Sequence, residues 1–575
     1  MRKKKILQRP LLTASHSLPA TLHPIMTRVY LARGVRSADD LDYALNRLPP
    51  PWSLGGIDVM ARRLAEAIEA GRRILVVGDY DADGATASAL AVSGLRALGG
   101  DQVGFMVPDR FRHGYGLSPA LVEAALSMAP DVLVTVDNGI TSLSGVAAAK
   151  AAGIEVLITD HHLPGAELPA ADAIVNPNLP QDGFPSKALA GVGVMFYVLT
   201  ALRAELRERG WFEKTGLVVP NLATLLDLVA LGTVADVVPL DGVNRILVHH
   251  GLQRIRSGRA RPGIQALVEV SGRNPRDLVA SDLGFALGPR LNAAGRLEDM
   301  ALGIRCLLAE DGDQARIYAL KLDALNRQRR EIEARMQADA LRYLESGDWR
   351  DCAAPGVCLF DPGWHEGVIG ILASRIKDRL GKPVIAFAES ENGILKGSAR
   401  SIPGVHIRDV LSAVDAVRPG LLARYGGHAM AAGVTLRRRD YETFARLFSE
   451  KVAEVVRELN EEDVIATDGA LSGEDFSLSL AESLRSGGPW GQGFPEPLFH
   501  GDFPVVSSRI VGGRHLKMTL RSPAGTPLDA IAFSLDDPAD WLSCNQLRMA
   551  FQLDVNEWRE RRCLQLKVDY MEPVG

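Results

Sequence analysis

RILVVGDYDADGATAS, at residues 73–88, is the segment from which the fold of the first half of this chain follows. Its first six residues form an apolar, β-branched run typical of a buried strand, and the acidic loop DYDADG then leads into small residues. Similar apolar runs follow at 103–107, 131–136 and 155–159, separated by Ala- and Leu-rich segments of helical length. This alternation indicates successive βαβ units, so we expect an α/β lobe whose parallel sheet is buried on both faces.

The other segments of the chain have different patterns. We expect the first lobe to span 71–312 and a helical segment, 1–70, to pack against it. Residues 313–345 contain neither Gly nor Pro and keep helical periodicity, which predicts one long connecting helix. A second α/β lobe is expected over 346–458, with VCLF and PVIAFA as strands. Short alternating runs between Gly and Pro turns predict a small five-stranded antiparallel barrel over 459–575.

Composition limits the kind of protein this can be. Its 575 residues carry 65 basic and 70 acidic side chains, and the net charge of −5 cannot steer a polyanion toward the protein, so any nucleic-acid contact must be local. With 47% hydrophobic and 23% charged residues, the chain is neither disordered nor a small binding module. The basic start is interrupted by Gln8, Arg9 and Pro10 before an apolar core develops, and no long apolar run follows. We therefore expect a cytoplasmic protein with no membrane contact.

Three aspartates stand at alternate positions of the acidic loop. In an extended segment, residues two apart point to the same side, so the carboxylates of Asp79, Asp81 and Asp83 converge. Crowded carboxylates repel one another, and a divalent cation is the natural compensation. The spacing also matches the start of an EF-hand calcium loop, but the acidic ligand which that loop needs at its twelfth position falls at Leu90. An acidic turn in solvent without an ion is the alternative.

Further side chains able to bind metals follow the next two strands. The third apolar run ends at Asp137, and the fourth ends at Asp160, His161 and His162. The carboxyl ends of parallel strands meet at one edge of a sheet, where α/β proteins form their ligand crevice. We therefore expect these side chains to gather there with the aspartates of the acidic loop.

Two more aspartates lie in the apolar segment DLVALGTVADVVPL. An unpaired charge would be costly in such surroundings, so Asp227 and Asp236 both need partners. Asp236 follows a glycine near a helix-to-loop transition and is the better ligand candidate. A structural role within the helix is the alternative for Asp227.

These ligand types indicate the metal and the reaction. Carboxylates with one or two imidazoles and no thiolate fit Mn²⁺ or Mg²⁺ better than Zn²⁺. So many acidic groups can hold two ions, the arrangement that recurs in displacement at phosphorus. Phosphoester hydrolysis is the reaction class that follows. His162, if it is not a ligand, would donate a hydrogen bond to the phosphate oxygens.

The order of these motifs resembles a known family. DYDADG, VDNG, DHH and GTVADVVPL resemble the four motifs of the DHH phosphoesterase superfamily, and YGGHAMAAG at 425–433 resembles the glycine-rich signature of its associated second domain, DHHA1. The strings PDRFRHGYGLS, GPRLNAAGRLED, GWHEGVIGILASRI and LKGSARS resemble the bacterial single-strand-specific exonucleases of this superfamily. Together the matches cover roughly residues 70–435, and the family carries an oligonucleotide-binding (OB) barrel in the remaining segment.

The resemblance implies an exonuclease that degrades single-stranded DNA 5′→3′ to mononucleotides in DNA repair and recombination, with Mn²⁺ or Mg²⁺ as cofactor. It implies a single-strand-binding protein and a RecQ-type helicase as partners. The implied metal ligands are Asp81, Asp83, Asp137, His161 and Asp236. The residues that complete or orient the site are then Asp79, Asp160 and His162. The spacing of the motifs says nothing about the direction of cleavage.

An enzyme that acts on strand ends also needs residues that hold phosphates. The planar guanidinium of arginine suits bidentate contacts with phosphate, and glycines let backbone amides approach an anion. The candidates are Arg110, Arg290, Arg296, Arg375, Ser398 and Arg400. By resemblance, the turn that contacts the nucleotide in the second domain is Gly426, Gly427 and His428. An ordinary surface or helix charge is the alternative for each arginine.

The barrel segment combines basic and aromatic side chains. A basic, strand-like run contains Arg514, His515, Lys517 and Arg521, and the nearby aromatic residues are Trp490, Phe494 and Phe499. A charged groove with aromatic platforms binds single strands without reading their sequence. An aromatic core beneath a solvated basic strand explains the same pattern equally well.

Two other functions are compatible with the same motifs. The first is hydrolysis of a short oligonucleotide or a cyclic dinucleotide, as in relatives built on the two α/β lobes alone. The second is a non-catalytic scaffold for single strands in replication or repair, which predicts missing ligands. The barrel segment argues against the first, and the complete set of candidate ligands argues against the second.

Overall fold

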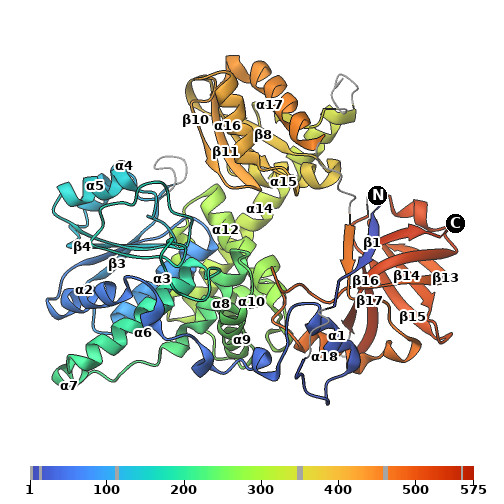
Figure 1. The fold of residues 1–575 in the computed structure, drawn as a ribbon, viewed down its shortest axis with the longest axis horizontal. Coiled ribbons are helices and arrows are strands. Elements are labelled where there is room, and N and C mark those ends of the chain that lie inside the picture. The colour runs from blue at the N-terminus through green and yellow to red at the C-terminus, as the bar shows by residue number, and fades with distance from the viewer. Residues whose placement is uncertain are drawn as a thin grey trace. The chain divides into compact units, whose positions relative to one another are not determined.

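The computed structural model describes residues 4–11, 16–109, 116–345, 354–457, 464–535, 537–558 and 561–574 (Figure 1). The contacts of the chain divide it into two compact units. The first unit comprises Met1–Gly295, Asp299–Leu320 and Glu462–Gly575, and the second comprises Arg296–Glu298 and Lys321–Glu461. Each unit has its own sheets and its own apolar core.

The first unit contains the predicted parallel sheet. Its strands are β2 (Ile74–Val77), β3 (Val103–Met106), β4 (Val132–Val136), β5 (Glu155–Thr159) and β6 (Ala173–Val175). They lie in the order β3-β2-β4-β5-β6 and are all parallel. Since β3 and β4 lie on opposite sides of β2, the direction of winding reverses between β2 and β4. The crevice at such a point, outside the carboxyl ends of the strands, is where doubly wound proteins bind ligands.

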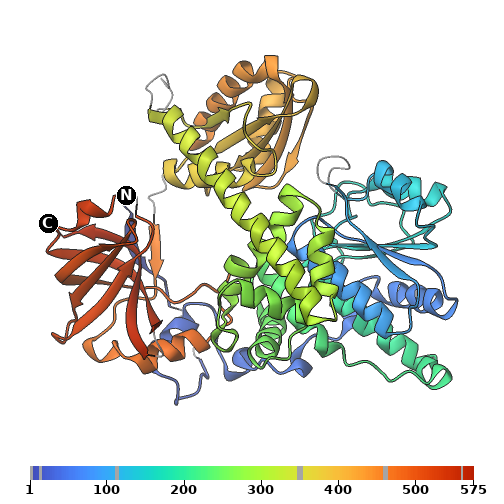
Figure 2. The same cartoon turned by 180° about the vertical axis from the view of Figure 1, so that it is seen from behind.

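Helices cover both faces of this sheet, which confirms the expected α/β class. They are α2 (Ile57–Glu69), α3 (Ala82–Ala97), α4 (Pro119–Leu126), α5 (Leu143–Ala151) and α6 (Gly191–Glu208). α4 and α5 pack on one face around an apolar cluster that includes Leu121, Val146 and Ile158. α2, α3 and α6 pack on the other face (Figures 1 and 2).

A helical region follows the sheet. Its elements are α7 (Trp211–Thr215), α8 (Leu226–Ala235), α9 (Gly242–Arg256), α10 (Pro262–Val270), α11 (Ala280–Asp282), the π-helical turn η6 (Leu283–Leu287), α12 (Gly288–Leu297) and α13 (Ala301–Leu308). α8 contacts α3, α6 and α9 and is buried along nearly its whole length. This packing brings the end of α8 to the carboxyl edge of the sheet.

The second unit is built on a mixed sheet. The long helix α14 (Gly312–Glu345) passes into it from the first unit without interruption, as the segment free of Gly and Pro predicts. The strands lie in the order β10-β11-β9-β8-β7, and β7 and β8 are the parallel pair. The elements are β7 (Val357–Phe360), α15 (Ile369–Leu380), β8 (Val384–Glu389), β9 (Ile394–Arg400), α16 (Ile407–Val417), β10 (Arg424–Gly427), β11 (Ala431–Arg437) and α17 (Tyr441–Val456).

The last segment of the chain closes into the expected five-stranded barrel. Its order is β13-β14-β15-β17-β16, and β15 and β17 are the parallel neighbours. The strands are β13 (Phe499–Val511), β14 (His515–Arg521), β15 (Pro527–Ala532), β16 (Gln546–Trp558) and β17 (Arg561–Pro573). Along β14 every second side chain is buried, so that Leu516, Met518 and Leu520 fill the interior. Helix α18 (Leu478–Ser486) packs on β16 and β17.

The N-terminal segment contacts the barrel region as well as the first lobe. α2 packs on α6 of the lobe, whereas β1 (Lys5–Gln8) pairs with β12 (Val464–Thr467). Just after α1 (Pro24–Leu31), the buried guanidinium of Arg33 donates to both carboxylate oxygens of Asp468, at 2.7 and 2.9 Å. The contact to the barrel region is additional to the packing expected from the sequence. None of the helices in the described ranges combines the length and apolarity needed to cross a bilayer.

Candidate metal centre

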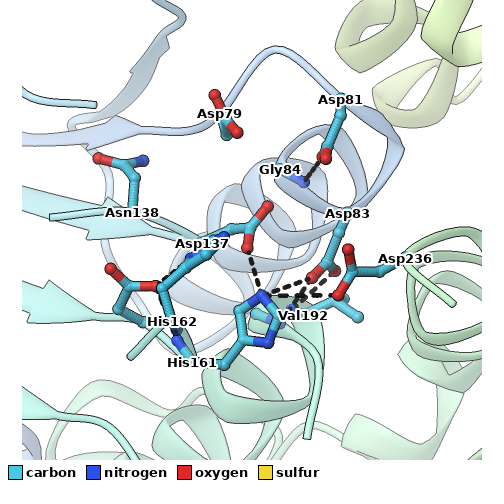
Figure 3. A network of polar contacts seen from close by, with 12 residues as sticks. Asp79, Asp81, Asp83, Gly84, Asp137, Asn138, His161, His162, Val192 and Asp236 are labelled. Atoms are coloured by element: carbon cyan, nitrogen blue, oxygen red, sulfur yellow. Dashed lines mark hydrogen bonds and ion pairs between the residues drawn. The ribbon is translucent and has the colours of Figure 1, made fainter. Parts of the chain in front are cut away.

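The acidic loop after β2 places its aspartates at the point where the winding of the sheet reverses (Figure 3). Asp81 caps α3, because its Oδ1 accepts a hydrogen bond from Gly84 N at 3.0 Å. The loop is also held from outside, since Ala82 N donates to Oδ1 of Asn292 on α12 at 2.8 Å. Asp79 is buried at the start of the loop. The ligand atoms of Asp79, Asp81 and Asp137 lie within 4.8 Å of one another.

Asp83 lies in the first turn of α3 and is only 1% exposed. The N-terminus of α6 holds its carboxylate: Gly191 N donates to Oδ2 at 2.6 Å, and Val192 N donates to Oδ1 at 3.0 Å. The dipole of this helix favours a negative charge at that end. Gly191 must be glycine, because a Cβ there would lie 2.5 Å from Cβ of Asp137. The start of α6 therefore fixes one ligand and makes room for another.

Asp137 follows β4 with a positive φ of 62°, a region that residues other than glycine adopt rarely. Its backbone N–H donates to Thr159 O of β5 at 3.1 Å, which holds the strand end in place. The side chain is 2% exposed, and Oδ1 lies 3.0 Å from Nε2 of His161. Within the described part of the chain, neither of these two atoms makes a hydrogen bond. Backbone strain of this kind is characteristic of functional sites.

Asp160 organises the DHH segment after β5. Its Oδ2 accepts a hydrogen bond from Ile140 N at 2.9 Å. Its Oδ1 accepts from the backbone N–H groups of His161 and His162, at 2.7 and 3.1 Å, and lies 2.7 Å from Nδ1 of His162. With both oxygens engaged and only 1% exposure, Asp160 orients the two histidines, and it belongs to none of the candidate ligand sets in the described chain.

Asp236 reaches the cluster from the end of α8. Its Oδ2 lies 3.5 Å from Nε2 of His161, and Oδ2 of Asp83 lies 4.0 Å from the same nitrogen (Figure 3). α8 can approach this closely because residue 232 is glycine: a Cβ there would lie 2.8 Å from Oδ1 of Asp83. The preference for Asp236 over Asp227 fits this geometry. Asp227 is buried elsewhere in α8, where its Oδ2 accepts from Arg261 N at 2.7 Å.

The carboxylates of the cluster repel one another. Burial, reinforced by the charge of Asp81, raises the pKa of Asp83 to about 7. Burial and the charge of Asp83 raise the pKa values of Asp137 and Asp236 well above the ordinary value. Ionised together, these groups are unfavourable unless a cation lies between them.

The two histidines differ in charge. Burial lowers the pKa of His161 to about 4, and the charge of His162 acts in the same direction. Burial also acts to lower the pKa of His162, but the hydrogen bond and charge of Asp160 outweigh it and raise that pKa to about 9. At neutral pH His161 therefore offers a lone pair to a metal, whereas His162 is a cation.

The residues present fit a bound divalent metal. The cluster contains three sets of residues, and within each set the ligand atoms lie within 4.8 Å of one another. The sets are Asp79, Asp81 and Asp137; Asp83, His161 and Asp236; and Asp137, His161 and His162. The buried atoms without hydrogen bonds, Asp137 Oδ1 and His161 Nε2, face each other where an ion would be bound. Carboxylates with imidazole match the preferences of Mn²⁺ and Mg²⁺. The first two of these sets share no residue, an arrangement compatible with two neighbouring ions.

Two of the predicted phosphate contacts, Arg110 and Arg290, belong to the first lobe. Arg110 lies outside the described residues. Arg290 is largely buried, and its guanidinium donates to Ala286 O and Val270 O. Through these contacts Arg290 ties α12 to η6 and to α10.

The second unit brings five of the predicted residues together. Ser398 of β9 is paired with Gly433 of β11, which is paired in turn with Gly426 of β10. Farther along the same strands, Arg400 of β9 pairs with Ala431 of β11, and Gly427 of β10 pairs with Ala432 of β11. The backbone N–H of His428 donates to Ala431 O. Arg400 Nη1 donates to Ser398 Oγ at 3.0 Å. The residues gathered at this end of the sheet are Ser398, Arg400, Gly426, Gly427 and His428.

The start of α15 lies against this group. A Cβ on Gly370 would lie 2.9 Å from Arg400 Nη2 and 3.0 Å from Ser398 Oγ. The other two arginines predicted to contact phosphate, Arg296 and Arg375, have different contacts. Arg296 Nη1 donates to Gly367 O at 3.3 Å, and Arg375 forms an ion pair with Glu333 at 3.0 Å.

Several asparagines support the metal centre although the sequence motifs did not predict them. Asn176 and Asn178, just after β6, donate to the carbonyls of His162 and His161, respectively. Asn138 Nδ2 donates to the last carbonyls of both β2 and β4, which ties these two strand ends together. The sequence signal was available for the first pair, because NPN follows the apolar run AIV at the same edge of the sheet. Asn292 gives no such signal, since it is remote in sequence from the loop that it holds.

The three aromatic residues near the barrel belong to the core. Trp490, Phe494 and Phe499 are all buried, and the rings of Trp490 and Phe494 stack at 5.0 Å. Trp490 Nε1 donates to Leu484 O at 2.7 Å. Their burial supports the alternative of core residues and excludes a role as exposed stacking platforms in this arrangement.

Comparisons with known proteins agree with this architecture. Family models match residues 73–233 (DHH family, N-terminal domain), 354–461 (DHHA1 domain) and 467–570 (RecJ OB domain). The single-stranded-DNA-specific exonuclease RecJ of Salmonella typhimurium is 51% identical over 100% of both chains. The crystal structure of RecJ from Thermus thermophilus in complex with Mn²⁺ has a TM-score of 0.80 at 32% identity, covering 100% of this chain and 80% of that one. The crystal structure of RecJ in complex with Mg²⁺ from the same organism has a TM-score of 0.74 at 31% identity, covering 96% of this chain and 75% of that one. The chain belongs to the RecJ family.

Proposed function

We propose that this protein is a metal-dependent exonuclease that degrades single-stranded DNA from the 5′ end and releases mononucleotides. The observation that carries the proposal is the convergence of buried carboxylates and a neutral histidine at the winding reversal of the sheet. Its support includes a relative that is 51% identical over its whole length, the single-stranded-DNA-specific exonuclease RecJ of Salmonella typhimurium. The 5′→3′ direction rests on the resemblance of the motifs.

The residues proposed to hold Mn²⁺ or Mg²⁺ are Asp81, Asp83, Asp137, His161 and Asp236, with Asp79 completing the site. Bound ions of this type lower the pKa of a water molecule and neutralise charge on a phosphoryl group. The N-terminus of α6 and the cap of α3 hold two of these carboxylates in place before any ion binds. The solved RecJ structures with Mn²⁺ and Mg²⁺ support this choice of metals.

His162 is proposed to act on the substrate. Asp160 keeps it protonated by raising its pKa to about 9, and the ring nitrogen that faces Asp160 is Nδ1. A cationic imidazole beside the metal centre donates a hydrogen bond to an oxygen of the scissile phosphate and favours the charge that develops there. Asp160 acts through His162 and is a positioning residue.

The modules are proposed to divide the work along the chain. Residues 71–312 carry the metal centre, and 346–458 contact the nucleotide through Ser398, Arg400 and the Gly426–His428 turn. Residues 459–575 bind the strand through the barrel, 313–345 connect the two lobes, and 1–70 support the first lobe. We keep Arg110, Arg290, Arg296 and Arg375 as candidate phosphate contacts.

The cellular setting belongs to the same proposal. The protein would act in DNA repair and recombination in the cytoplasm, where a RecQ-type helicase supplies single strands and a single-strand-binding protein covers them. The two alternatives fit less well. The closed barrel is superfluous for hydrolysis of short oligonucleotides, and a scaffold without activity does not require a complete ligand set.

The test is digestion of a single strand labelled at either end, with Mn²⁺ or with EDTA. We expect mononucleotides to be released first from the 5′ label, in the presence of metal only. Asp137→Asn abolishes release while the strand stays bound. Release from the 3′ end first would refute the direction, and activity that is confined to dinucleotides would favour the small-substrate alternative.

A further inference from the structure

Phe285 is an exposed aromatic side chain that no part of the proposed mechanism uses. It is 80% exposed, compared with 50% for Phe533 and 48% for Trp52. Single exposed apolar residues are common and by themselves need no explanation. The position of Phe285 is what sets it apart.

Phe285 lies in the π-helical turn η6, which packs directly on the helix that supplies Asp236. A Cβ on Gly284 would lie 3.3 Å from the side chain of Val234, and one on Gly288 would lie 3.1 Å from Cβ of Ala235. η6 therefore crosses the last turn of α8 immediately before Asp236. π-helical turns are rare and occur frequently at functional sites.

The continuous helical segment that contains η6 also reaches the acidic loop. Asn292, seven residues after Phe285, accepts a hydrogen bond from Ala82 N. η6 continues directly into α12, so Phe285 and Asn292 belong to one uninterrupted helical segment. One helical segment thus connects the turn that carries the exposed ring with the side chain that holds the loop of Asp81.

A second apolar side chain adjoins the same ligand. Val237 directly follows Asp236 and is 63% exposed. It has a φ of 62°, which is a genuine outlier for a β-branched residue. Such strain persists only where the surrounding structure imposes it, and it is concentrated at functional sites. The residue therefore places an apolar side chain in solvent beside a metal ligand at a cost in stability.

We propose that Phe285 and Val237 form an apolar rim beside the metal centre, on which a nucleobase next to the scissile phosphate stacks. This inference rests on the proposed function, because it assumes that single-stranded DNA is the substrate. Every base has a flat apolar face, so the rim holds the strand without reading its sequence. A base can lie on the ring only when it is unstacked from its neighbours, which favours single strands over duplexes.

The test uses a strand with one abasic nucleotide, moved stepwise from the first to the sixth position after the 5′ end. For the wild-type protein, kcat/KM falls about 10-fold when the abasic nucleotide occupies the stacking position, a factor typical of one lost base contact. Phe285→Ala lowers kcat/KM on the intact strand by a similar factor. In this variant the abasic nucleotide at that position causes no further loss, and Phe285→Tyr restores wild-type behaviour.

A binding measurement keeps the proposal independent of turnover. In an Asp137→Asn background, 2-aminopurine at the stacking position is quenched on binding, and Phe285→Ala removes the quenching. Trp52→Ala, which removes an exposed aromatic side chain from the N-terminal segment, is the matched control and leaves both readouts unchanged. Thermal unfolding of Phe285→Ala is expected to match the wild type, since the ring is exposed.

The outcomes separate the two proposals. If the wild-type protein does not degrade the labelled strand, the proposed function fails. If it does, but the penalties of the abasic nucleotide and of Phe285→Ala add at every position, the rim is refuted. Wild-type DNA readouts for Phe285→Ala would also refute it and would assign the ring to a protein contact.

Discussion

Asp137 combines a strained backbone with a buried charge, so its substitutions separate function from stability. Asp137→Asn keeps a residue that tolerates positive φ and removes the charge that neighbouring carboxylates repel. We expect cleavage to fall about 100-fold or more, as for the loss of a metal contact, while the metal-free protein becomes more stable. Urea unfolding with EDTA, together with single-strand digestion, measures both effects.

Asp137→Ala is the control for this substitution. It also removes the charge, but alanine at a φ of 62° costs about 1 kcal/mol or more. It should therefore be less stable than Asp137→Asn while being equally inactive. Equal stability of the two variants would contradict the role assigned to the backbone.

The raised pKa of Asp83 makes the stability of the metal-free protein depend on pH. The folded carboxyl keeps its proton up to about pH 7, whereas the unfolded one loses it near 4, so the folded state binds more protons between these values. The free energy of unfolding therefore falls as pH rises from about 4 to 7, by up to about 1.4 kcal/mol per pH unit for this group. Urea unfolding in EDTA at pH 5, 6, 7 and 8 checks the slope.

Asp83→Asn isolates the contribution of this carboxyl. The variant should lose stability less steeply over the same pH range than the wild type. Added Mg²⁺ should flatten the wild-type slope, because a cation compensates the charges. Identical slopes for the two proteins in EDTA would contradict the account of the cluster.

Much of the site could be predicted residue by residue, for a definite reason. Asp79, Asp81, Asp83 and Asp137 follow apolar runs, and the topology of parallel strands brings them to one edge whatever the details of packing. The asparagines that support the site could not be predicted in this way. Their contribution is a hydrogen bond to one particular backbone group, which the pattern of the sequence does not encode.

Among the helices, α8 depends on close packing to deliver Asp236. A Cβ at Gly232 would lie 2.2 Å from Oγ1 of Thr86 and 2.8 Å from Oδ1 of Asp83, so Gly232→Ala must displace α8 or the carboxylate. We expect Mn²⁺ affinity to fall by about 10-fold or more, as for disturbed supporting contacts of a metal site. Isothermal titration with Mn²⁺ measures the change.

Gly242→Ala in α9 is the matched control, since a Cβ there meets no atom within 4 Å. This variant should bind Mn²⁺ as the wild type does. Unchanged affinity of Gly232→Ala would show that α8 does not need to approach α3 so closely.

The elements that were predicted well are those with strong local signals. β2, β4 and β5 are apolar runs followed by polar loops, and α14 lacks any residue that would end it. β1 is four residues long and carries no comparable signal. Its partner strand lies more than 450 residues away, so the pairing depends on the assembled unit.

At the level of the whole molecule, one buried aspartate joins the N-terminal segment to the barrel region. Asp468 accepts from Arg33 and from Arg9, and its side chain is fully buried. Asp468→Ala leaves the buried guanidinium of Arg33 without its carboxylate partner, which should destabilise the first unit by about 3–5 kcal/mol. Urea unfolding and limited proteolysis of the N-terminal segment report the change, while Mn²⁺ affinity should be unaffected.

An exposed ion pair on the barrel provides the comparison. Arg548 pairs with Asp502 at 2.9 Å, and both side chains are well exposed. Arg548→Ala should cost at most about 1 kcal/mol. Similar losses from the two variants would mean that Asp468 does not join the N-terminal segment to the barrel region.

The metal centre is the claim on which the enzymatic account depends, and anomalous diffraction from a crystal soaked in Mn²⁺ tests it most directly. We expect manganese peaks among the carboxylates of Asp83, Asp137 and Asp236 and Nε2 of His161, with a second peak toward Asp79 and Asp81. A map without manganese density at these side chains, in a crystal that binds the ion elsewhere, would contradict the account.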